Sequence, residues 1–115
     1  MAVMSSDGAW RVLAGEVPAA GVQVMVDDPQ LGEVIVVHHQ GVHAYRNSCP
    51  HVGVGLDYGD GDCLAEPGVL ICSLHGALFA AESGLCTDGP CQGDVLARIP
   101  IRVSERGIEV PCTIP

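Results

Sequence analysis

The chain has 115 residues, with 14 acidic and 5 basic side chains and a formal net charge of −9 at pH 7. This is the length of one domain, so we expect residues 1–115 to form a single domain with no room for a separate catalytic domain. Because lysine is absent and the arginines are scattered, the charge excludes a nucleic-acid surface, argues against an anionic membrane and favours a protein partner with a positive face.

Strand patterns dominate the first part of the chain. Trp10–Val17 is predicted to begin the first strand, and valines alternate with other residues over Val22–Val26. Asp27-Asp28-Pro29 then predicts a turn. The next two runs, Glu33–His39 and Val42–Arg46, flank the turn Gln40-Gly41 and predict a β-hairpin.

Glycine-rich segments interrupt the second part. Residues 47–62 and 84–93 are predicted loops, and the strands expected around them are Val69–Cys72, Ala77–Ala80, residues 98–103 and Ile108–Val110. No apolar period of 3.6 residues holds over ten residues, so we expect no helix of that length. The fold class is therefore all-β, a small sandwich or barrel with a loop-rich insert over about residues 47–93.

The sequence pattern does not indicate a targeting signal or a membrane span. Met1–Trp10 has neither the charged start nor the apolar run of a signal peptide, and the longest apolar stretch, Val34–Val37, is too short to cross a bilayer. We therefore expect a soluble, cytoplasmic protein. In a reducing compartment, six cysteines are expected to be metal ligands or thiols rather than a disulfide framework.

Two cysteine–histidine pairs are the candidate metal ligands. Cys49-Pro50-His51 and Cys72-Ser73-Leu74-His75 each follow a predicted strand, and Gly76 closes the second motif. Thiolate and imidazole together suit zinc or iron. The single residue between Cys49 and His51 makes a cramped chelate of one ion and favours a binuclear centre, with the sulfur on one metal and the nitrogen on the other.

These paired motifs resemble the Cys-x-His and Cys-x-x-His motifs of Rieske iron–sulfur proteins. The chain resembles a small Rieske-type [2Fe-2S] ferredoxin from about residue 10 to 110. It departs from the family in the twenty residues (52–71) between the motifs, which is a longer gap than usual. The segment 61–68, with Cys63, is the extra material and is expected to lengthen a hairpin without moving the ligands.

The resemblance implies that Cys49 and Cys72 hold a buried iron, and that His51 and His75 hold an outer iron whose imidazoles face solvent. Histidine ligation raises the reduction potential into the range of about −150 to +300 mV.

Within that range we expect a low potential, because the hydrogen-bond donors and the disulfide of high-potential members are replaced by four apolar residues, namely Val54, Leu74, Ala77 and Phe79.

A third loop is implied to shield the cluster. Gly89 and Pro90 resemble the proline-bearing shielding loop of the family, and Cys86 and Cys91 bracket them. Two alternatives stay open for this pair: a local disulfide, or thiols packed beside the cluster, which a reducing cytoplasm favours. Cys63 and Cys112 fit no motif and are expected to remain thiols.

The remaining polar residues have less specific interpretations. His38, His39 and His43 flank a hairpin turn and are expected to be solvated. Four acidic residues of the insert form either a docking patch or an ordinary solvated loop: Asp57, Asp60, Asp62 and Glu66.

The implied function is one-electron transfer, not catalysis, from a flavoprotein reductase to a terminal oxygenase. An oxygenase needs a further iron site in a large domain, for which this chain has no room. Three alternatives remain: an accessory Rieske subunit similar to the small subunit of a nitrite reductase, a zinc-stabilised interaction module, and a redox or iron sensor. The donor, the acceptor, the downstream substrate and the oligomeric state are left open by the sequence.

Overall fold

The computed structural model describes residues 9–50, 55–57, 61–72 and 76–112. The described residues contain strands and turns but no helix, and therefore no helix that could cross a membrane. This confirms the all-β fold class. The strands, in chain order, are β1 (Trp10–Ala14), β2 (Gln23–Asp28), β3 (Gly32–His38), β4 (Val42–Arg46), β5 (Leu64–Glu66), β6 (Val69–Ile71), β7 (Leu78–Ala80), β8 (Cys86–Asp88), β9 (Arg102–Ser104) and β10 (Gly107–Pro111).

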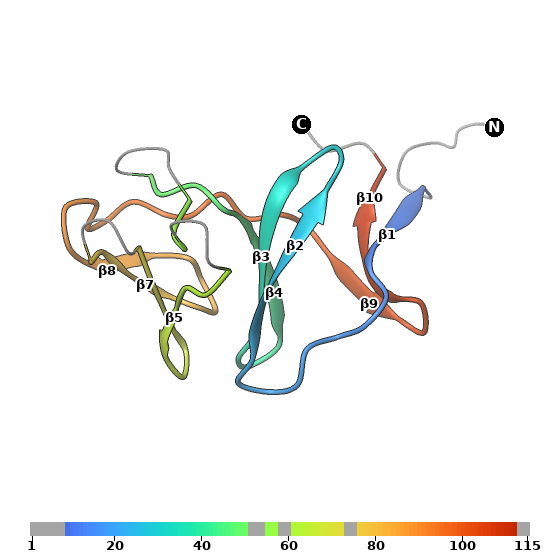
Figure 1. Cartoon of the computed structure of the whole chain (residues 1–115), viewed down its shortest axis with the longest axis horizontal. Coiled ribbons are helices and arrows are strands. Elements are labelled where there is room, and N and C mark those ends of the chain that lie inside the picture. Colours follow the sequence, from blue (N-terminus) through green and yellow to red (C-terminus); the bar gives the residue numbers. More distant parts are fainter. Residues whose placement is uncertain (1–8, 51–54, 58–60, 73–75, 113–115) are drawn as a thin grey trace.

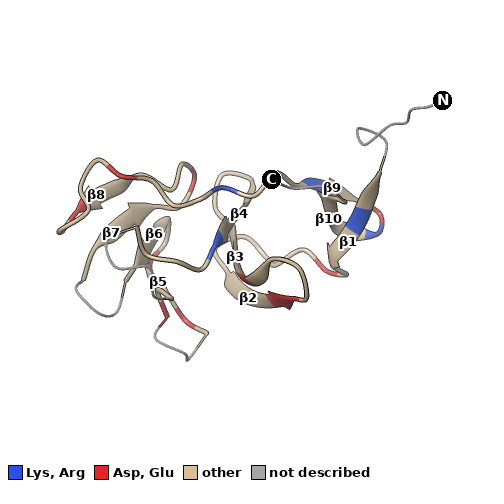
Figure 2. Ribbon diagram, turned by 90° about the horizontal axis from the view of Figure 1, so that it is seen from above, with Lys and Arg blue, Asp and Glu red and all other residues tan. Residues whose placement is uncertain are grey.

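The strands form three antiparallel sheets, arranged in a row. β2–β3–β4 lies in the middle, with β5–β6–β7–β8 on one side and β1–β10–β9 on the other (Figures 1 and 2). The chain thus leaves the middle sheet at residue 46, builds the four-stranded sheet as an insert, and returns through residues 98–101. The insert begins where the loop-rich segment was expected, at residue 47, but it extends past residue 93 to residue 97, whose carbonyl accepts the N–H of Arg46.

The central strand β3 separates two apolar cores. Ile35 and Val37 pack toward the four-stranded sheet, whereas Val34 and Val36 pack with residues of β1 and β10. All four side chains are fully buried. A strand covered on both faces has no polar side, which explains why its sequence is a continuous apolar run rather than an alternation.

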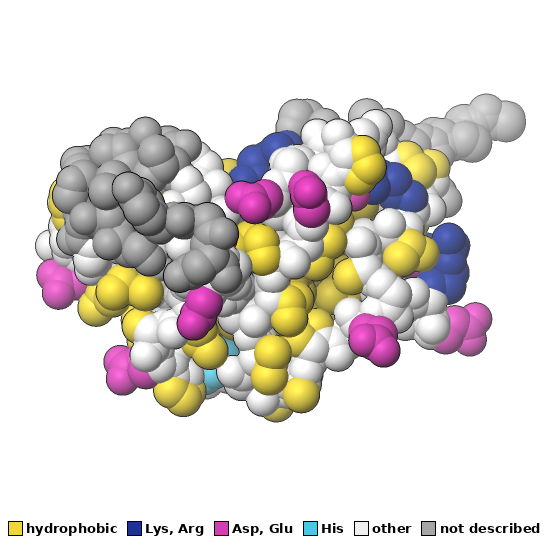
Figure 3. Space-filling view, in the orientation of Figure 1, with side chains coloured by type: hydrophobic (Ala, Val, Ile, Leu, Met, Phe, Trp, Pro, Cys, Tyr) yellow, Lys and Arg dark blue, Asp and Glu magenta, His cyan; other side chains and the backbone are white. Residues whose placement is uncertain are grey.

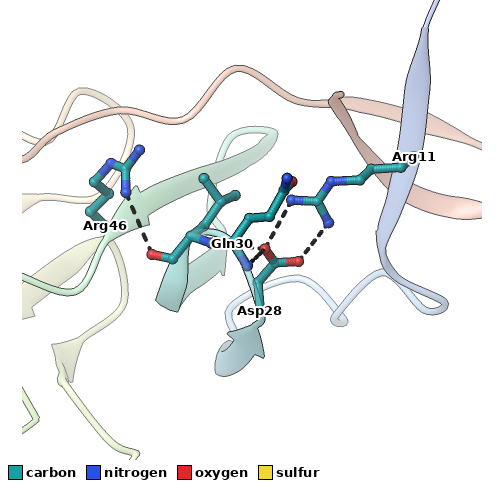
Figure 4. A network of polar contacts seen from close by, with 5 residues as sticks. Arg11, Asp28, Gln30 and Arg46 are labelled. Carbon is teal, nitrogen blue, oxygen red and sulfur yellow. Dashed lines mark hydrogen bonds and ion pairs between the residues drawn. The ribbon is translucent and has the colours of Figure 1, made fainter. Parts of the chain in front are cut away.

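The turn predicted at Asp27-Asp28-Pro29 is wrong by two residues. Both aspartates belong to β2, where they pair with β3, and the chain turns only after Asp28. The Asp28 carboxylate accepts hydrogen bonds from the amides of Gln30 and Leu31 and a bidentate ion pair from Arg11 of β1, at 2.7 and 2.9 Å (Figure 4). These bonds hold the pKa of Asp28 well below its usual range, the Arg11 pair contributing most.

Two further elements differ from the sequence-based expectation. The loop predicted over 84–93 contains the short strand β8, which pairs with β7. The expected strand over 98–103 is regular only in β9, and its earlier part makes a single bridge between Arg98 and Tyr45. The segment 61–68 supplies β5, which pairs with β6 as one arm of a hairpin.

Candidate metal centre

The first cysteine loop is closed by the side chain of Asn47, which lies between β4 and Cys49. The Asn47 amide oxygen accepts the backbone N–H of Leu56 at 2.7 Å, and its Nδ2 donates to Asp57 Oδ1 at 2.9 Å. Nδ2 also lies 3.1 Å from Glu33 Oε1 on β3. One side chain therefore joins the two ends of the segment that contains the first motif.

Asp57 extends this closure toward the insert. Its second carboxylate oxygen accepts the backbone N–H of Gly61 at 2.7 Å, and the residue is 2% exposed. Gln23 of β2 then holds the next residues, since its amide accepts the N–H of Cys63 and donates to the carbonyl of Gly61. Asp57 is thus a structural residue of the loop and not part of an exposed docking patch.

Hydrogen bonds join the two described ends of the second cysteine loop, between β6 and β7. The backbone N–H of Cys72 donates to the carbonyl of Ala77 at 2.9 Å, and the N–H of Gly76 donates to the carbonyl of Cys72 at 2.8 Å. Gly76 has a φ of 74°, in the left-handed region that favours glycine. The second motif is thereby placed in a loop whose two ends are hydrogen-bonded to each other.

The third loop packs against the second. A Cβ at Gly89 would lie 2.8 Å from the Ala77 Cα, so only glycine permits this approach. Cys91 of the same loop is buried next to the thiols of Cys86 and Cys49. Burial, together with these two thiols, raises the pKa of Cys91 to about 12.

These contacts gather the predicted residues into one apolar core. Cys49 and Cys72, which are 1% and 0% exposed, belong to the same buried cluster, and so do Ala77, Phe79 and Cys91. Pro90 is exposed, on the outside of the third loop. The four other predicted residues, His51, Val54, Leu74 and His75, lie outside the described residues.

Sequence reasoning missed a polar network that ties the middle sheet to the four-stranded sheet. Tyr45 of β4 donates its hydroxyl proton to the carbonyl of Ala81 at 2.6 Å, and Arg98 lies over the Tyr45 ring with its guanidinium carbon 5.3 Å from the centroid. Arg98 donates to the carbonyl of Glu82 at 2.6 Å and lies 3.2 Å from the Tyr45 hydroxyl. The tyrosine alone, in a strand pattern, gave no sign of these partners.

The prediction of solvated histidines is wrong, because all three are partly buried. His38 Nδ1 lies 2.7 Å from the carbonyl of Pro18, and His43 Nδ1 lies 3.4 Å from Arg98 Nη1. The His39 ring packs so closely on the β5–β6 turn that a Cβ at Gly68 would lie 2.7 Å from it. The hairpin turn therefore contributes side chains to the contact between sheets.

The cysteine side chains present fit the inner end of an iron–sulfur site. Two thiols that enter one buried apolar core from two separate loops are the soft sulfur ligands that an iron–sulfur cluster takes. Within the described ranges no group of three or more histidine, cysteine or acidic side chains could hold a metal ion.

The sequence matches the Rieske [2Fe-2S] domain family over residues 8–103. The chain belongs to the Rieske [2Fe-2S] family. Its cofactor is accordingly a Rieske-type [2Fe-2S] cluster, which decides against the zinc alternative. A search of curated proteins found no match.

Solved structures of carbazole 1,9a-dioxygenase components share the fold. A chain of the complex of reduced oxygenase and oxidized ferredoxin in carbazole 1,9a-dioxygenase is 23% identical, with a TM-score of 0.66 and coverage of 89% of this chain and 92% of that one. The terminal oxygenase of carbazole 1,9a-dioxygenase from Nocardioides aromaticivorans IC177 is 22% identical, with a TM-score of 0.73. That match covers 93% of this chain but only 31% of the oxygenase.

A third structure, the reduced complex between oxygenase and ferredoxin in carbazole 1,9a-dioxygenase, matches at 16% identity and a TM-score of 0.71. The match covers 90% of this chain and 28% of that one. The present chain thus spans less than a third of the longer chains that it matches, and their likeness to it is one of fold.

Proposed function

We propose that this Rieske-type electron carrier is the ferredoxin of a multi-component oxygenase system, and that residues 1–115 form its single domain. It accepts one electron from a flavoprotein reductase and passes it to a terminal oxygenase, within the cytoplasm. The observation that carries the proposal is the family match over residues 8–103, together with two cysteines buried in one core. The oxygenase–ferredoxin complexes among the structural neighbours support the choice of acceptor.

We assign four residues as the ligands of the [2Fe-2S] group: Cys49 and Cys72 for the inner iron, and His51 and His75 for the outer iron. When bound, the group accepts and releases a single electron. The protein's part is to hold the two thiolates in an apolar core that excludes water, through the Asn47 closure of the first loop and the Ala77–Cys72 turn of the second.

Iron binding tests this assignment directly. We expect Cys49→Ser and Cys72→Ser to lose the visible absorption and most of the bound iron, because each removes a thiolate from the core. Cys112→Ser is the matched control, since that cysteine is exposed, and should retain both. Anaerobic titration of the unaltered protein should consume one electron per two irons. Full iron retention in either ligand variant would contradict the assignment.

We expect a low reduction potential because two buried side chains donate no hydrogen bond to the cluster or to the cysteine sulfurs. Ala77 and Phe79 are fully buried beside the cysteines, and neither carries a hydroxyl. We expect Ala77→Ser or Phe79→Tyr to raise the midpoint by about 60 mV, which corresponds to about 1.4 kcal/mol for one electron, the size of a hydrogen bond to a charged group. Voltammetry that places the unaltered protein well above zero would contradict the low-potential proposal.

The partners are tested by rapid mixing. An NADH-dependent flavoprotein reductase of a Rieske oxygenase system should reduce the protein, and a purified terminal oxygenase should reoxidise it, both faster than a ferredoxin with four thiolate ligands. If neither enzyme exchanges electrons with a protein that still titrates with one electron, the chain is a carrier for another redox enzyme.

A further inference from the structure

Two cysteines outside the proposed ligand set face each other in the third loop. Cys86 begins β8, and the thiol of Cys91 donates to the Cys86 sulfur at a distance of 2.9 Å. Both residues are buried, at 1% and 3% exposure, and both are thiols in this structure. A disulfide bond is about 2.05 Å long, so the two sulfurs need to approach by less than about 1 Å to form one.

The backbone around the pair is already fixed. The N–H of Cys86 donates to the carbonyl of Asp94 at 2.8 Å, and the N–H of Gly93 donates to the carbonyl of Cys86 at 3.1 Å. The N–H of Asp94 in turn donates to the carbonyl of Cys91 at 2.8 Å. These three bonds close the loop on both sides of the two sulfurs and hold the backbone of the pair in place.

The turn between the two cysteines is short and exposed. The four residues between the cysteines, 87–90, are all exposed and form the outer wall of the pair. This wall includes Gly89, whose φ of 104° gives the turn its shape. Hydrogen peroxide is small enough that a local opening of this single turn admits it to the two sulfurs.

We propose that Cys86 and Cys91 form a redox-active dithiol, which hydrogen peroxide converts reversibly into a disulfide within the loop. The Cys86 sulfur, which accepts the hydrogen bond, attacks one peroxide oxygen; the O–O bond breaks, and a sulfenic acid and one water form. The Cys91 sulfur then displaces the sulfenic oxygen, which leaves as a second water. Two S–H bonds are lost and one S–S bond forms, and the peroxide receives the two electrons.

The Cys86–Cys91 pair lies next to the proposed metal centre, so its oxidation state affects the surroundings of that centre. The turn that it brackets packs on Ala77 through Gly89, and Cys91 lies beside Cys49. A disulfide therefore restrains the loop that covers both cysteine loops. This consequence, unlike the disulfide itself, rests on the proposed function.

Peptide mapping tests the proposal on the intact cluster-loaded protein. Equimolar hydrogen peroxide is added under argon, and the protein is then unfolded in iodoacetamide and cut after glutamate and before aspartate. The sequence places Cys86 alone in peptide 83–87 and Cys91 alone in peptide 88–93. We expect these peptides to become joined as the main product, to separate on treatment with dithiothreitol, and to stay separate without peroxide.

Two variants sharpen the result. Cys86→Ser should leave Cys91 fully alkylated, whereas Cys112→Ser, altered at an exposed cysteine, should form the joined peptides as the unaltered protein does. The proposal is overturned if both cysteines remain alkylated after peroxide, if Cys91 is joined to any other cysteine, or if only sulfinic and sulfonic acids form. The peptides are read without reference to iron content, so failure here is separate from failure of the electron-carrier proposal.

Discussion

The hydroxyl of Tyr45, in the middle sheet, donates a hydrogen bond of 2.6 Å to the carbonyl of Ala81, directly after β7 of the four-stranded sheet. Both residues are fully buried. Because β7 continues the turn that begins at Cys72, this bond connects the proposed metal centre to the part of the fold that is built on continuous strands.

Tyr45→Phe is expected to destabilise the protein by about 1–3 kcal/mol. The change removes the tyrosine hydroxyl and leaves the buried Ala81 carbonyl without this donor. Denaturation with urea, followed by circular dichroism, measures the effect. Val103→Ala, at a side chain that is 54% exposed in another sheet, is the control and should change stability by less than about 0.5 kcal/mol. Equal stability of the two variants would contradict a structural role for the Tyr45 hydroxyl.

Asn47→Asp is expected to weaken cluster retention strongly. The new carboxylate still accepts the N–H of Leu56, but it replaces a donor with an acceptor 2.9 Å from Asp57 and near Glu33. Loss of visible absorption in the presence of a chelator should accelerate about tenfold, which corresponds to about 1.4 kcal/mol.

A charge exchange provides the control for that prediction. In Asn47→Asp/Asp57→Asn the amide and the carboxylate change places, so one donor again faces one acceptor within the pair, while the exposed Glu33 still faces a carboxylate. We expect the double variant to recover most of the cluster lifetime. If it loses the cluster as fast as the single variant, the closure of the first loop does not depend on this pair.

Gly89→Ala and Gly93→Ala separate packing from backbone strain. Both glycines have φ values near 100°, but an added Cβ meets Ala77 only at Gly89 and nothing within 4 Å at Gly93. Both variants should lose about 1 kcal/mol or more of stability from the left-handed backbone. Only Gly89→Ala should also shorten the cluster lifetime in chelator, since it alone displaces the loop from Ala77. Equal lifetimes would argue against a shielding contact there.

Asp28→Asn should make the free energy of unfolding less dependent on pH in the acidic range. The pKa of Asp28 is lowered in the folded state, so the ion pair with Arg11 stabilises the protein above the unfolded pKa of about 4 and loses this effect as the pH falls. We expect a cost of about 3 kcal/mol at pH 7, at the low end for a buried pair because the Arg11 side chain is 27% exposed. Urea denaturation at pH 7 and pH 3.5 should show a smaller difference from the unaltered protein at the lower pH.

On the face shown in Figure 3, the acidic side chains of the described residues are dispersed. In Figure 3 they are spread over both ends of the visible face and over its centre, between apolar and neutral residues. A partner with a positive face, as the net charge of −9 favours, would therefore meet a dispersed negative field on this side rather than one acidic patch.

The strands that the sequence predicted well are those whose burial produces a pattern. β3 is a continuous apolar run because both its faces are covered, and the hairpin with β4 follows from Gln40-Gly41. β5 and β8 have three residues each, which is too short for an alternation, and they exist because they pair with β6 and β7. These two strands depend on pairing with their neighbours, so a short stretch of sequence alone does not predict them.

The candidate site likewise contains residues that the sequence predicted and residues that it did not. The cysteine motifs were visible because the ligand types lie one or two residues apart in the sequence. Asn47 gave no signal, since its partners Glu33 and Asp57 are distant in the chain and each alone is an ordinary surface residue type. The Cys86–Cys91 contact was one of two alternatives from spacing, and the structure shows the thiol pair together with the distance that makes a bond attainable.

The most direct test of the account is the electron paramagnetic resonance spectrum of the dithionite-reduced protein, prepared with ¹⁵N-labelled histidine. A centre held by Cys49 and Cys72 on one iron and by His51 and His75 on the other predicts an average g value below that of a four-thiolate [2Fe-2S] protein, with hyperfine coupling to two histidine nitrogens. A spectrum without histidine coupling, or a colourless protein that contains zinc, would contradict it.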